Sequence, residues 1–123
     1  MTNRLLKEEE LVSLYKWLDS VPLSRPKRDL SSDFSDGVLL AELIHFFCPK
    51  LVNLEEYSPS EVMPSKLYNW NKLNGTKPSP WINLLEKVLS ELNIRLKASE
   101  IQKIVTGVPG ILEPLLKKLK DRF

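Results

Sequence analysis

The feature that most constrains the fold is the segment Val38–Phe47, which is apolar on nearly every side. Only Glu42 and His45 interrupt it. A helix with apolar residues all round is surrounded by other structural elements. We therefore predict that this segment is the buried central helix of the fold, and that Pro49 ends it.

Asp33, Asp36 and Gly37 precede this helix. Carboxylates before a helix accept hydrogen bonds from its first N–H groups and favour the positive end of its dipole. We predict that both aspartates cap the central helix. Gly37 has no side chain, so it allows another element to pack closely there.

Three other segments carry apolar residues at the spacing of one helical face, and two shorter ones are weaker helix candidates. Ser99, followed three residues later by Gln102, resembles a capping box for the second short helix. No segment alternates as a strand does, so the chain is predicted to be all-α. The three longer helices are Leu11–Leu18, Leu84–Leu92 and Leu115–Leu119, and the shorter ones are Ser65–Leu73 and Ile101–Val105.

The chain has 123 residues, 42% of them hydrophobic and 28% charged, which is typical of one soluble globular domain. No apolar run approaches the ~20 residues that cross a bilayer, and the acidic start does not resemble a signal peptide. We expect a cytoplasmic protein without membrane insertion. A net charge of +2 is far from the basic footprint of a nucleic-acid binder.

Catalytic and metal-binding constellations are missing from the sequence. Cys48 is the only cysteine and His45 the only histidine, so neither a zinc site nor a nucleophile with its base can be assembled. Trp17, Trp70 and Trp81 are most simply core aromatics. We expect no enzyme activity and no cofactor.

Several stretches together resemble a calponin-homology domain, in particular that of the sperm-flagellar-protein group, also called CLAMP (calponin-homology and microtubule-associated proteins). The resemblance covers about residues 8–122. It rests on Leu14–Leu18, Pro22–Leu30 and Asp33–Leu39, with further matches at Phe47–Lys50, Tyr57–Pro59, Lys66–Leu67, Asn69–Trp70, Lys87–Leu89 and Leu92–Asn93.

The resemblance implies a single domain of four main helices plus short connecting ones around the central helix. It also implies binding and bundling of microtubules in cilia, flagella or cortical arrays, without a cofactor. A coiled-coil tail pairs the chains in full-length relatives, so the isolated domain is expected to be a monomer. The chain departs from these relatives at Ser32, where they carry an arginine, and in residues 75–85, which look like an inserted loop.

Three sets of cations are candidates for a microtubule-binding site. The first is the basic loop, Arg25, Lys27 and Arg28, which Pro22 and Pro26 stiffen; stiffness lowers the ordering cost of binding. Tubulin is strongly acidic, so these cations would be complementary to it. The alternative is a solvated loop that only keeps the domain soluble. The second set lies near the end of the chain, and the third is weaker: Lys117, Lys118, Lys120 and Arg122, then Lys66 and Lys72.

Two other functions compete with microtubule binding. Tandem calponin-homology pairs bind actin, although this chain carries a single copy. An adaptor that binds a signalling or structural protein without touching a filament is the other possibility. For the second set of cations, the ordinary polar face of an amphipathic helix is the better explanation of the residues.

Overall fold

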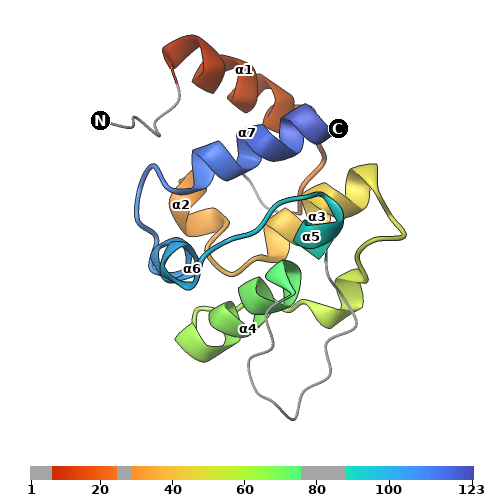
Figure 1. Cartoon of the computed structure of the whole chain (residues 1–123), viewed down its shortest axis with the longest axis vertical. Helices are drawn as coiled ribbons and strands as arrows, with labels where there is room; N and C mark the ends of the chain where they lie inside the picture. The colour runs from red at the N-terminus through yellow and green to blue at the C-terminus, as the bar shows by residue number, and fades with distance from the viewer. Residues whose placement is uncertain (1–6, 25–28, 76–87) are drawn as a thin grey trace.

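The computed structural model describes residues 7–24, 29–75 and 88–123, and every regular element within them is a helix (Figure 1). The all-α prediction is therefore confirmed. α1, α3, α4 and α7 are the four longest helices, and shorter ones connect them. The elements are α1 Glu8–Asp19, α2 Leu30–Asp33, α3 Val38–Phe47, the 3-10 helix η1 Leu54–Glu56, α4 Met63–Asn74, α5 Val88–Glu91, α6 Ala98–Val105 and α7 Leu112–Arg122.

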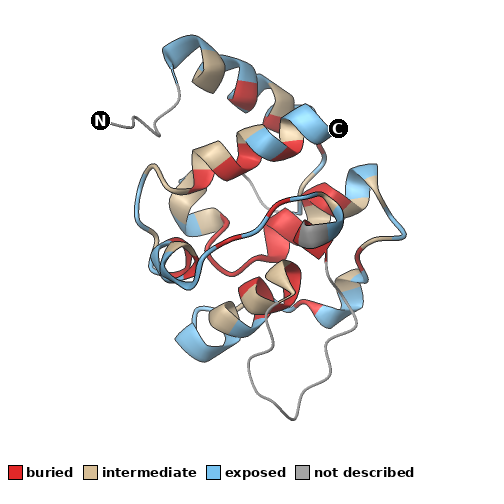
Figure 2. Cartoon of the chain, in the orientation of Figure 1, coloured by how far each residue is buried: buried red, intermediate tan, exposed pale blue. Residues whose placement is uncertain are grey.

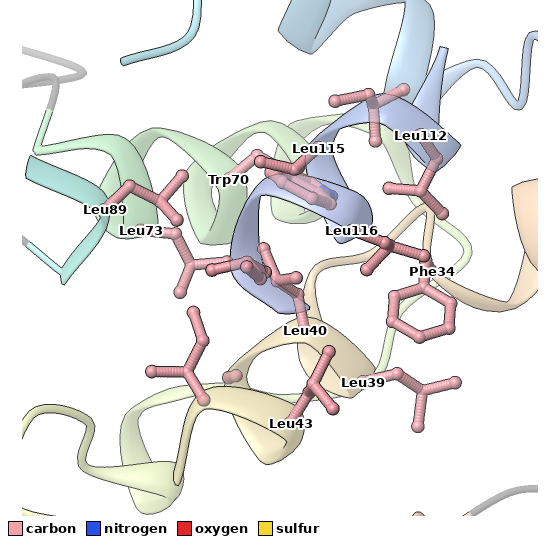
Figure 3. Close-up of a cluster of buried hydrophobic side chains, with 14 of the residues drawn as sticks. Phe34, Leu39, Leu40, Leu43, Trp70, Leu73, Leu89, Leu112, Leu115 and Leu116 are labelled. Atoms are coloured by element: carbon pink, nitrogen blue, oxygen red, sulfur yellow. The ribbon is translucent and has the colours of Figure 1, made fainter. Parts of the chain in front are cut away.

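The predicted central helix is confirmed as α3, with the predicted bounds. Leu40, Leu43 and Ile44 have no exposed surface, and much of α3 is coloured as buried in Figure 2. Figure 3 shows what covers α3: leucines of α7, Leu89 of α5, and Trp70 with Leu73 of α4. An apolar helix is stable here because other helices remove its faces from water.

The start of α3 is held by a buried polar network. One carboxylate oxygen of Asp36 accepts from the backbone N–H of Val38 at 3.0 Å, and the other accepts from that of Ser60 at 3.1 Å. Gly37 has φ +81°, and a Cβ there would lie 3.3 Å from Cβ of Asn69. The predictions of capping by Asp36 and close packing at Gly37 are confirmed.

Asp33 does not cap α3. It lies inside α2, where its carboxylate accepts from the backbone N–H of Asp29 at 3.1 Å. The prediction was wrong for this residue because the chain makes a separate helical turn, α2, before α3. The Asp33 carboxylate makes its hydrogen bond to Asp29 within that turn.

Helix α4 makes side-chain hydrogen bonds to the backbone just before α3, and we call this contact the α3–α4 junction. The Asn69 side chain donates to the backbone oxygens of Asp36 at 2.8 Å and Ser58 at 3.1 Å. The indole N–H of Trp70, which is fully buried, donates to the backbone oxygen of Ser35 at 2.9 Å. Trp70 is thus the core aromatic that the sequence predicted.

The remaining predicted helices are present where the structure describes them, although their ends differ. α1 and α7 extend beyond Leu11–Leu18 and Leu115–Leu119, and α4 begins before Ser65. α6 begins at Ala98, not after Ser99, because the Glu100 carboxylate accepts from the Lys97 N–H at 2.9 Å. The segment predicted as Leu84–Leu92 contains α5, and its first part lies outside the described residues.

Candidate functional site

The basic loop itself, Arg25, Lys27 and Arg28, lies outside the described residues, but both of its flanks are described. Before it, Ser24 donates its N–H and its hydroxyl to the two carboxylate oxygens of Glu42, at 2.8 and 2.6 Å. After it, Asp29 begins α2. Glu42 belongs to α3, so the chain enters the basic loop from a point bonded to the central helix.

Sequence reasoning missed this role of Glu42. The available signal was a carboxylate on an otherwise apolar helix, because such a group needs hydrogen-bond donors close by.

The cations of α7 divide between two edges of the helix. Lys117 faces α1: its ammonium lies 3.8 Å from the Glu10 carboxylate and 2.8 Å from that of Asp121. The hydrogen bond to Asp121, together with its negative charge, raises the pKa of Lys117. Lys118 lies on the other edge, where it lines a pocket between α6 and α7 with Ile104.

Arg122 follows Lys118 by four residues and shares its edge, since helical residues three or four apart are neighbours. Arg122 and Lys118 are exposed, and Lys120 is partly buried. None of the three forms an ion pair with a residue that the structure describes. They are therefore available to an external acidic surface.

The two lysines of α4 differ sharply from each other. Lys66 is partly exposed, and its ammonium donates to the Ser35 hydroxyl at 3.2 Å. Lys72 is only 7% exposed. Its ammonium lies 2.5 Å from the Glu56 carboxylate and 5.2 Å from the centre of the Tyr57 ring. Lys72 thus stabilises the contact between α4 and η1, and little of it is left for a partner.

Four aromatic rings meet where α1, α3 and α7 come together, and we call them the aromatic patch: Trp17, Phe46, Phe47 and Phe123. Phe47 stacks on Trp17 at 5.6 Å and on Phe123 at 4.6 Å between ring centres, and Phe46 meets Phe47 edge-on at 5.0 Å. Trp17 is partly buried and packs against the core. It lies off the apolar stripe of its helix, so the sequence was compatible with either a core residue or a half-exposed one. Sequence reasoning missed the patch because its members come from three helices.

Other kinds of site find little support in the described part of the chain. Within residues 7–24, 29–75 and 88–123, no three His, Cys, Asp or Glu side chains come together as metal ligands would. None of the helices described is long and apolar enough to span a membrane. His45 is partly exposed on α3. Of residues 75–85, which the sequence predicts to be an inserted loop, the structure describes only Gly75, which ends α4. Trp81 lies outside the described residues.

Known proteins resemble this chain over most of its length. It is 44% identical to sperm flagellar protein 1 of Bos taurus, and 45% identical to that of Mus musculus, over 116 residues each. Those matches cover 94% of the chain but only 44% and 45% of the relatives, so the chain spans less than half of their length. Calmodulin-regulated spectrin-associated protein 2 of Mus musculus is 41% identical over 68 residues, which are 54% of the chain and 4% of that protein.

A family model described as "CH-like domain in sperm protein" matches residues 14–121. That range runs from α1 to the last turn of α7 and includes the α3–α4 junction and the basic loop. The chain therefore belongs to the family of CH-like domains in sperm protein.

Proposed function

We propose that this chain is a microtubule-binding module of a ciliary, flagellar or cortical cytoskeletal protein. Its relatives are named for the sperm flagellum and for association with spectrin, and both names point to the cytoskeleton. Bundling of microtubules would require the remainder of a longer protein, because one domain with one binding surface cannot cross-link two filaments.

One observation carries the proposal: the end of α1 and the end of α7 lie side by side. The ring centres of Trp17, in the last turn of α1, and Phe123, next to Arg122, are 6.5 Å apart. The C-terminal ends of α1 and α7 therefore lie next to each other. The basic loop follows α1 in the sequence, and we propose that it acts together with the cations of α7 on one acidic surface.

Several cations are needed because each exposed pair contributes little. An ion pair at the rim of an interface is typically worth ~1 kcal/mol or less. The basic loop and the cations Lys118, Lys120 and Arg122, which form no ion pair with a described residue, would together reach a useful affinity. Lys66 lies at the α3–α4 junction and is a weaker member of this set. Lys72 is left out of the proposed surface because it is buried against Glu56.

Cosedimentation with polymerised tubulin and, separately, with filamentous actin tests the proposal. We expect the chain to pellet with microtubules and to remain in the supernatant with actin. Pelleting with actin alone would favour an actin-binding domain. A folded chain that pelleted with neither filament would favour an adaptor.

A further inference from the structure

The aromatic patch leaves a large apolar area open to solvent at the C-terminal end of α3. Phe46 is 50% exposed and Phe47 36% exposed, although the other apolar residues of the same helix are buried. The four rings form a cluster around Phe47, which contacts each of the other three. Single exposed apolar residues are ordinary, but contiguous exposed groups of this kind mark interaction sites.

Aromatic side chains are also the residues that contribute most to binding. They bury a large area on contact and lose little conformational freedom, so they are enriched at the energetic centres of protein interfaces. Phe47 and Phe46 pack on other rings of the patch, which holds them in place before a partner arrives. A prearranged apolar centre lowers the cost of association.

The charges next to the patch indicate the chemistry of the partner. Lys16 precedes Trp17, and Arg122 precedes Phe123; both cations are exposed. Lys120 lies three residues before Phe123 and therefore on the same side of α7. The neighbouring Asp121 is already paired with Lys117. Asp19, two residues after Trp17, is an exposed acidic residue on the α1 side, so the cations Lys16, Lys120 and Arg122 outnumber the acidic residues Asp19 and Asp121. This balance suits an acidic surface that offers an apolar side chain at its centre.

We propose that the aromatic patch is the apolar centre of the microtubule contact and receives an apolar side chain from an acidic segment of tubulin. The cations at the end of α7 form the rim of the same contact. This inference rests on the proposed function and adds to it an uncharged component, contributed by residues that the charge pattern did not indicate.

The two components respond differently to salt. Exposed charges are screened over ~8 Å at physiological ionic strength, so their contribution falls as salt rises. The burial of apolar surface does not depend on charge screening. Replacement of Phe46 by alanine should therefore weaken binding by the same factor at every salt concentration, about tenfold for a residue at the centre of an interface. The factor by which Arg122→Ala weakens microtubule binding should become smaller as salt is added.

The experiment measures cosedimentation with microtubules for wild type, Phe46→Ala, Arg122→Ala and Tyr68→Ala over a salt series, with circular dichroism to confirm folding. Tyr68 is the matched control, because it is a 39% exposed aromatic residue on α4. We expect a salt-independent loss for Phe46→Ala, a salt-dependent loss for Arg122→Ala and no loss for Tyr68→Ala. Phe46→Leu, which keeps an apolar side chain, should recover most of the binding.

Two results would overturn the inference while the proposed function stands. In the first, wild type and folded Phe46→Ala pellet equally with microtubules. In the second, wild type is a dimer by sedimentation velocity and Phe46→Ala is a monomer, which would assign the patch to a second copy of the chain. A wild-type chain that does not pellet would instead contradict the proposed function itself.

Discussion

The two ends of α3 are built in different ways. At its N-terminal end, Asp36 and the indole of Trp70 make hydrogen bonds inside the protein, and Gly37 brings α4 into close contact. At its C-terminal end, Phe46 and Phe47 are partly exposed and pack mainly on other aromatic rings. The first end leaves little for a partner to bind, and the second offers both apolar surface and neighbouring cations.

This difference separates residues that stabilise the fold from residues that are available for binding. Changes at the α3–α4 junction should lower the stability of the fold, because they would leave the hydrogen-bond partners of Asp36, Asn69 or Trp70 unpaired. Changes at the aromatic patch and the end of α7 should act on binding, because those side chains already contact water.

The largest effect is expected from Trp70→Ala, at the junction. The side chain is fully buried, and its removal leaves a cavity and an unpaired backbone oxygen on Ser35. Large-to-small changes of a buried tryptophan cost about 3–5 kcal/mol. Chemical unfolding should show this loss, and a free energy of unfolding within 1 kcal/mol of wild type would contradict the described junction.

A smaller effect separates Lys72 and Lys118, which the sequence offered as binding candidates in two different sets. Lys72→Ala should lower the free energy of unfolding by about 1–2 kcal/mol, because it removes a buried stem and a cation facing Glu56 and Tyr57. Lys118→Ala should change stability by less than about 0.5 kcal/mol and weaken microtubule binding a few-fold. Chemical unfolding and cosedimentation should be measured on both variants. The assignment would be contradicted if Lys118→Ala lowered the free energy of unfolding and Lys72→Ala weakened microtubule binding without loss of stability.

The smallest effect concerns pH at the α1–α7 contact. Partial burial raises the pKa of Tyr15, and the nearby Glu113 carboxylate raises it further. The unfolded chain then loses this proton first, so the stabilisation is present below the ordinary pKa of about 10 and is lost as pH rises through the folded value. Unfolding at neutral and strongly alkaline pH should show a steeper loss for wild type than for Tyr15→Phe. Equal losses would exclude a contribution from Tyr15.

The sequence predicted the core better than the surface, for physical reasons. Val38–Phe47 was recognised with its bounds because nearly all of its consecutive residues are apolar. The exposure of Phe46 and Phe47 at its end was not predicted. Lys72 could not be recognised as buried, since its partners Glu56 and Tyr57 come from a separate connection whose path only the folded chain defines. The same holds for the stacking of Phe47 on Trp17 and Phe123, which three different helices bring together.

The family resemblance predicted a function for the basic segments, which local sequence patterns alone did not. Periodicity identified helices one by one, but it gave no reason to join a loop after α1 to the end of α7. The family match to residues 14–121 agrees with the resemblance, and the contact between Trp17 and Phe123 places the C-terminal ends of α1 and α7 side by side.

The most direct test of microtubule binding through the basic loop is the variant in which Arg25, Lys27 and Arg28 are all replaced by alanine. Several weak charge pairs would be lost together, on the order of 2–3 kcal/mol, which is roughly a thirtyfold to hundredfold loss of affinity. Cosedimentation with microtubules over a salt series should show this loss at low salt and a smaller difference at high salt. Circular dichroism should show that both proteins are folded. A folded triple variant that pelleted as well as wild type would show that the basic loop is not the binding site.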